Sequence, residues 1–170
     1  MGYVNDTHMS IFIPPGDFEF SEGTWTVQSG SNIIIRQRSA NDAAFAALIP
    51  IRLMGNSSYR KGCRLEEIKV WYRIEGVEAD DFEKVNLIKN TVGPDDVSVQ
   101  AATIPISLDA GHDSAAKRKA LDDDHCMTVT LTTPVWVSED DIYYLYLTID
   151  CHADSVVTFV AARANFTLRV

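Results

Sequence analysis

Histidine, cysteine and aspartate side chains lie close together at several points of the chain, where they could bind a metal ion. His125 with Cys126, and Cys151 with His152, are adjacent donors of the types that zinc accepts. Zinc sites usually take ligands about two to four residues apart, whereas neighbours in a strand point to opposite faces. We therefore predict no metal site and no cofactor.

Asp109, Asp113 and residues 122–124 offer carboxylates to a hard cation such as calcium. The chain has no Asp-x-Asp-x-Asp-Gly loop, so a solvated acidic segment is the simpler interpretation. Whether residues 109–124 bind a cation stays open.

A hydrolytic site would need a nucleophile, a base and an orienting group. Ser114 follows His112 and Asp113, and carboxylate pairs such as Glu66 with Glu75 are available. None of these residues belongs to a nucleophile elbow, a phosphate-binding loop or a zinc-binding helix motif. We predict that the chain is not an enzyme and has no catalytic residues, with a hydrolase as a minor alternative.

Aromatic residues offer another kind of site, because ring faces can stack on sugar rings. Trp71 and Trp136 are the candidate ligand-stacking residues, and Tyr144 and Tyr146 could join them if exposed. The alternative is that these rings are buried in a core or at a subunit contact.

The composition limits the choice of partner. The 170 residues carry a formal charge of −9, which would repel nucleic acid, and Lys117, Arg118 and Lys119 are followed at once by acidic residues. No apolar run approaches the roughly 20 residues that span a bilayer, and the amino terminus lacks an export signal. Three cysteines do not fit a disulfide framework. We expect no nucleic-acid or membrane partner, and assembly in the cytoplasm.

Alternation of apolar and polar residues predicts strands over much of the chain. Less regular patterns predict additional strands at 17–20, 24–27, 33–36, 82–89 and 97–108. Pro134 is expected to end the strand that contains Leu131. The predicted inward-facing residues are Phe45, Ala47, Ile49, Ile51, Leu53, Ile68, Val70, Tyr72, Ile74, Met127, Val129, Leu131, Tyr143, Leu145, Leu147, Ile149, Val160, Ala162, Ala164, Phe166, Leu168 and Val170. This pattern favours an all-β, two-sheet antiparallel sandwich of about eight strands, with a jelly roll as the expected topology.

Two segments stand apart from the strands. Residues 1–15 are predicted to form an amino-terminal arm, because Pro14, Pro15 and Gly16 interrupt regular structure, and residues 16–170 form a single domain. Residues 109–124 are polar and long enough for a crossover loop with one helical turn, and this loop is the expected mobile or functional segment.

One predicted strand is apolar on both faces. Val157, Phe159 and Ala161 lie opposite the core-facing set. Beside Tyr144 and Tyr146, they would form an exposed apolar strip suited to a subunit interface. Cover by residues 109–124 or by the amino-terminal arm is the alternative.

Residues 104–113 (IPISLDAGHD), 127–131 (MTVTL) and 161–167 (AARANFT) resemble small jelly-roll proteins of tailed-phage virions. The resemblance implies a structural role as a capsid decoration or fibre-associated subunit. It also implies a homo-oligomer, commonly a trimer, that contacts other virion proteins. We therefore predict a non-enzymatic virion protein, with a carbohydrate- or ligand-binding module as the alternative.

Overall fold

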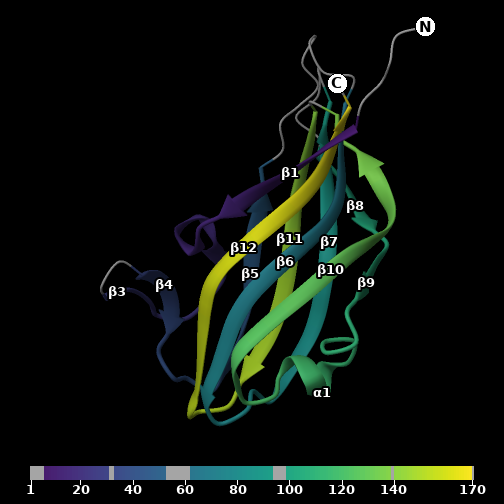
Figure 1. The fold of residues 1–170 in the computed structure, drawn as a ribbon. Coiled ribbons are helices and arrows are strands. Elements are labelled where there is room, and N and C mark those ends of the chain that lie inside the picture. The colour runs from purple at the N-terminus through teal and green to yellow at the C-terminus, as the bar shows by residue number, and fades with distance from the viewer. Residues whose placement is uncertain (1–5, 31–32, 53–61, 94–98, 139, 170) are drawn as a thin grey trace, which may run out of the picture.

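The computed structural model describes residues 6–30, 33–52, 62–93, 99–138 and 140–169. Within these ranges the chain folds into two antiparallel β-sheets that pack face to face (Figure 1). The predicted all-β sandwich is confirmed, with twelve strands among the described residues, while a jelly-roll topology is not confirmed. Leu53 and Val170, predicted to face inward, lie outside the described residues.

The first sheet has the strand order β3-β4-β12-β6-β10-β9. Strand β1 pairs with residues 162–169 of β12, and β4 pairs with residues 158–159 of the same strand. The strands of this sheet are β1 (Asp6–Ile13), β3 (Trp25–Gly30), β4 (Ile33–Arg38), β6 (Cys63–Gly76), β9 (Ile106–Leu108), β10 (Asp122–Trp136) and β12 (Ser155–Arg169).

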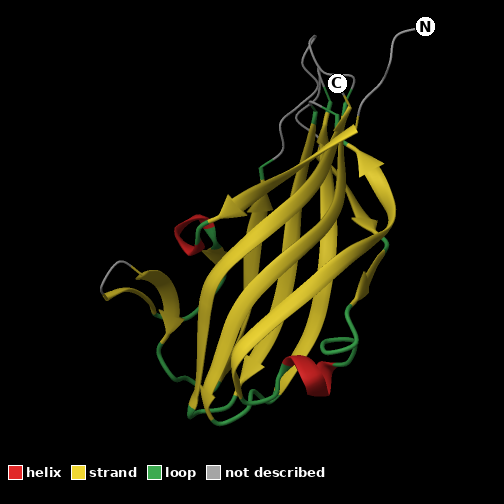
Figure 2. Cartoon of the chain, in the orientation of Figure 1, coloured by secondary structure: helices red, strands yellow, loops and turns green. Residues whose placement is uncertain are grey.

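The second sheet has the order β2-β5-β11-β7-β8. Its strands are β2 (Glu19–Phe20), β5 (Ala43–Ile51), β7 (Asp81–Val92), β8 (Val99–Ile104) and β11 (Asp141–Cys151). A short 3-10 helix, Pro15–Asp17, and the one-turn helix α1 (Ala115–Arg118) lie between strands (Figure 2). No helix in the described ranges is long or apolar enough to cross a membrane.

The core lies between the two sheets and follows the predicted alternation in most strands. Every second residue of β11 from Tyr143 to Ile149 is at most 1 % exposed, and the inward residues of β6 and β5 are buried in the same way. Apolar side chains on facing pleats bury each other, which is the main favourable term in folding.

The prediction that Pro134 ends its strand was wrong. Strand β10 continues through Pro134 to Trp136. The pairing with β6 shifts register between Thr130 and Val135, which places Pro134 in an irregular stretch. A proline is tolerated there because it replaces no regular ladder hydrogen bond.

The predicted apolar strip is also corrected. Val157 and Phe159 are fully buried in the core of this chain. A β-bulge between Phe159 and Ala161 adds one residue, Val160, to β12 and reverses which face the following residues occupy. Val160 therefore does not face inward as predicted, although Ala162 does.

The remaining interface candidates lie on two different sheets. Ala161 is half-buried on β12 of the first sheet, whereas Tyr144 and Tyr146 belong to β11 of the second sheet. These residues therefore form no continuous surface with Val157 and Phe159.

The amino-terminal segment is part of the sandwich over residues 6–13. These residues form β1, and the Ile13 side chain belongs to the core. The predicted arm is corrected over this range, because pairing with β12 makes the segment a sheet strand. The predicted loop at 109–124 does contain one helical turn, α1, but its last residues already belong to β10.

Candidate binding site

A cleft opens on the outer face of the first sheet, where β1, β12 and β6 lie side by side. Its volume is about 400 Å³. We call it the carboxylate cleft, and it is lined by His8, Met9, Ser10, Glu66, Glu67, Arg163, Asn165 and Phe166. It is an open concave surface crossed by polar side chains from three strands.

A β-bulge in β6 places two neighbouring carboxylates in this cleft. Glu67 pairs with Asn165 and Leu65 pairs with Phe166, so Glu66 is an extra residue on β6. Leu65 and Ile68 are both buried, while Glu66 and Glu67 are both half-buried. In a regular strand adjacent side chains point to opposite faces, so the bulge is what brings both carboxylates to the outer face.

Glu66 is held by residues on both sides. Its Oε1 accepts hydrogen bonds from the Thr167 hydroxyl at 2.6 Å and from the Arg64 guanidinium at 2.9 Å. The Thr167 hydrogen bond lowers the pKa of Glu66 most, and Arg64 also lowers it, against the opposing effect of burial. Thr167 donates its only hydroxyl hydrogen to Glu66, so the 3.3 Å contact with His8 requires a donating Nδ1–H.

Glu67 ends a second chain of hydrogen bonds. The Asn165 side-chain amide donates to Glu67 Oε1 at 2.7 Å, and the Ser10 hydroxyl donates to Asn165 Oδ1 at 2.7 Å. The Lys69 ammonium lies 3.8 Å from the same carboxylate oxygen. The cleft thus presents oriented acceptors and donors that a polar ligand could use.

Aromatic rings lie on this face at both ends of the cleft. Phe12 stacks on Trp71 with ring centroids 6.2 Å apart, and the Arg163 guanidinium lies 5.5 Å from the Trp71 centroid. At the other end, Trp136 is 44 % exposed, and the Arg169 guanidinium lies 4.8 Å from its centroid. The two predicted stacking residues, Trp71 and Trp136, therefore occupy one face together with the carboxylates.

Tyr144 and Tyr146 lie on the opposite side of the molecule. Both are half-buried on the outer face of the second sheet. Their register partners on β5 and β7 include Pro50, Leu48 and Ile88, which are also half-buried. We call the surface of Leu48, Pro50, Ile88, Tyr144 and Tyr146 the tyrosine face.

The three side chains considered for a nucleophilic site, those of His112, Asp113 and Ser114, each contact other residues. The Ser114 hydroxyl accepts a hydrogen bond from the Lys117 backbone, and Asp113 pairs with the Lys117 ammonium at 2.8 Å. The His112 ring instead contacts Asp109 and His125.

The adjacent metal donors differ in burial within each pair. His125 is buried while Cys126 is exposed, and Cys151 is buried while the His152 side chain is 44 % exposed. Across the described part of the chain, no three histidine, cysteine, aspartate or glutamate side chains are grouped to hold a metal ion.

Several cleft residues could not be found by sequence reasoning. His8, Arg163 and Asn165 join Glu67 in lining the cleft only through the pairing of β1 with β12 and of β12 with β6. One signal was present: Leu65 and Ile68 are three residues apart, which breaks the two-residue period and indicates a bulge. No family model matches the chain, and no curated protein matches its sequence.

Proposed function

We propose that this chain is a non-enzymatic, ligand-binding β-sandwich module that binds a neutral carbohydrate on the outer face of its first sheet. The observation that carries the proposal is the bulge that sets Glu66 and Glu67 side by side in the carboxylate cleft, on the same face as Trp71 and Trp136. Binding sites typically combine aromatic surface with a few oriented polar groups.

The polar groups match the chemistry of sugar hydroxyls, which both donate and accept hydrogen bonds. Glu66 and Glu67 have acceptor lone pairs beyond those already used, and Arg163 and Asn165 are donors. A ring face of a sugar could rest against the exposed part of Trp136. The formal charge of −9 disfavours an anionic ligand, which makes a neutral glycan the better match.

The length of the face favours an extended glycan over a single sugar ring. Trp136 is the register partner of Arg64, and Trp71 lies seven residues farther along β6. At about 3.3 Å per residue, the two tryptophans are separated by roughly 20 Å along the strand. A chain of several sugar rings could contact both aromatic ends and the carboxylates between them.

A glycan array followed by NMR titration with the best neutral glycan tests the proposal. We expect amide shifts confined to β1, β6 and β12 around the cleft. Trp71→Ala and Glu67→Gln should each weaken binding about tenfold, which corresponds to about 1.4 kcal/mol. Glu75→Gln, on the same strand beyond the cleft, should bind like the unaltered chain. Absence of binding to all neutral glycans, or shifts confined to the second sheet, would reject the proposal.

A second candidate function is that of a self-associating structural subunit, such as a virion protein that forms a trimer. The tyrosine face favours it, because five apolar or aromatic side chains from three adjacent strands stay only half-buried there. Apolar patches of this kind tend to mark contact surfaces.

Size-exclusion chromatography with light scattering, which gives the mass of the assembly in solution, tests the second candidate function. We expect an oligomer that Tyr146→Glu converts to monomers, because a carboxylate buried at the contact would lack a partner. Gln100→Glu, which adds the same charge at an exposed position of β8, should leave the oligomer intact. A monomer at all concentrations would exclude this function.

A further inference from the structure

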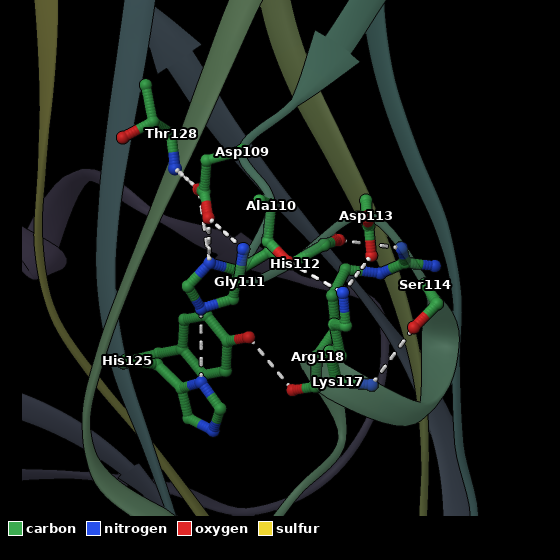
Figure 3. A network of polar contacts seen from close by, with 11 residues as sticks. Asp109, Ala110, Gly111, His112, Asp113, Ser114, Lys117, Arg118, His125 and Thr128 are labelled. Carbon is green, nitrogen blue, oxygen red and sulfur yellow. Dashed lines mark hydrogen bonds and ion pairs between the residues drawn. The ribbon is translucent and has the colours of Figure 1, made fainter.

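Two buried histidines face each other where the loop after β9 meets β10 (Figure 3). His112 and His125 are 8 % and 5 % exposed. His112 Nε2 lies 3.2 Å from His125 Nδ1, within hydrogen-bonding distance. We call these two residues the histidine pair. Neither residue lines the carboxylate cleft.

The outer nitrogen of each ring must carry a hydrogen. His112 Nδ1 lies 2.8 Å from Asp109 Oδ1, and an ionised carboxylate can only accept. His125 Nε2 lies 2.9 Å from the Ala120 carbonyl oxygen, which also can only accept. Both outer nitrogens are therefore donors, and this determines the tautomer of each ring.

These tautomers leave no hydrogen between the rings if both are neutral. A neutral imidazole has one N–H, and in each ring that N–H already points outward. Two lone pairs would then oppose each other at 3.2 Å. We propose that His112 and His125 share one additional proton, so that the pair carries one positive charge and forms a pH-sensitive latch between the 109–120 loop and β10.

Asp109 is placed to compensate this charge. Its carboxylate also accepts the Thr128 and Gly111 backbone N–H groups. Burial alone would raise the pKa of Asp109, but the hydrogen bonds from Thr128 and His112 outweigh it and hold the pKa below its usual range. The ionised carboxylate therefore lies beside the shared proton near neutral pH.

The other groups around the histidine pair come from β6, α1 and the start of β10. The Tyr72 ring stacks on His125 with centroids 4.4 Å apart, and burial raises the pKa of Tyr72, so this ring is neutral. The Arg118 guanidinium donates to the His112 carbonyl oxygen at 3.0 Å and so adds a positive charge nearby.

Further charged groups lie around His125. Asp124 and Arg73 line the small cavity beside this ring, and the Asp122 charge acts on Tyr72, which stacks on His125. Asp109, Asp122 and Asp124 therefore favour the charged pair, while Arg118 and Arg73 oppose it.

The latch connects the loop to β10 at two points. Asp109 accepts the Thr128 backbone N–H, and His125 holds both His112 and the Ala120 carbonyl. Loss of the shared proton leaves facing lone pairs, so one of these contacts must break and the loop must loosen. The contact between the two rings needs the shared proton, so its contribution to stability is present at low pH and is lost as pH rises.

NMR of the histidine ring nitrogens tests the proposal directly. Between about pH 5 and 8, where histidines ordinarily change charge, we expect the ring-nitrogen signals of both residues to change together. His112 Nδ1 and His125 Nε2 should stay protonated throughout. Amide protection in residues 109–120, corrected for the intrinsic pH dependence of exchange, should fall as the shared proton is lost.

His125→Gln is the decisive variant. A glutamine amide can donate to His112 Nε2 without an additional proton, so the pH dependence of loop protection should disappear. His152→Gln, at the exposed turn between β11 and β12, is the matched control and should keep the pH dependence of loop protection. The proposal fails if His125 carries its hydrogen on Nδ1 with Nε2 bare, or if a folded His125→Gln variant keeps the pH dependence. If that variant does not fold, the ring spectrum of the unaltered chain decides alone.

Discussion

The buried carboxylate of Asp141 connects strands β11 and β7 of the second sheet. Its side chain is 6 % exposed and lies 3.3 Å from the Lys89 ammonium, and it accepts the Thr91 hydroxyl at 2.7 Å. Burial raises the pKa of Asp141, but the Thr91 and Lys89 hydrogen bonds outweigh this effect and lower it below the usual range. The same surroundings, chiefly burial and then the Asp141 charge, raise the pKa of Tyr143 to about 12.

Asp141→Asn should lower the free energy of unfolding by about 1–3 kcal/mol near neutral pH, because it removes charge-assisted hydrogen bonds. The Asp141 pKa is depressed in the folded state. The contribution of Asp141 to the free energy of unfolding is therefore present above its pKa in the unfolded chain, about 3.9. It is lost as the pH falls through the pKa of the folded state. Urea unfolding at several pH values should show that the free energy of unfolding falls less steeply toward acidic pH in the variant than in the unaltered chain. Asp140→Asn, exposed and adjacent, should behave like the unaltered chain.

Bulges decide which residues of β12 and β6 face the core. Val157 and Phe159 are buried before the bulge at Val160, and Ala162 is buried after it. The extra residue bends the strand and changes the face without interrupting the sheet. The same device in β6 places Glu66 and Glu67 together in the carboxylate cleft.

Phe159→Ala should lower the free energy of unfolding by about 3–5 kcal/mol, because a fully buried ring is replaced by a cavity. Phe12→Ala removes the same ring from a side chain that is 64 % exposed and should cost much less. Chemical denaturation of both variants measures the difference. Equal effects would contradict the placement of Phe159 in the core.

The strand faces could be predicted wherever pairing is regular, as from Ile68 to Ile74 and from Tyr143 to Ile149. Prediction failed at Val160 because a bulge depends on the register of the partner strand, which a single sequence does not contain. The meeting of cleft residues from different strands was out of reach for the same reason. His8 and Thr167 are far apart in the chain and meet only through the β1 to β12 pairing.

The molecule as a whole presents two outer faces of different character. The first sheet carries carboxylates, arginines and aromatic rings, whereas the tyrosine face of the second sheet is mainly apolar. All copies also carry the same formal charge of −9. Association through the second sheet must therefore overcome mutual repulsion, while binding of a neutral glycan to the first sheet need not.

Salt should separate the two proposed functions. The Debye length falls from about 30 Å at 0.01 M salt to about 3 Å at 1 M, so added salt screens the repulsion between copies. Across that range, self-association through the tyrosine face should strengthen by about tenfold, or about 1.4 kcal/mol, in sedimentation experiments. Glycan affinity, measured by NMR in parallel, should change little because the ligand is uncharged. If salt instead dissociated the oligomer, ion pairs and not the apolar tyrosine face would hold the copies together.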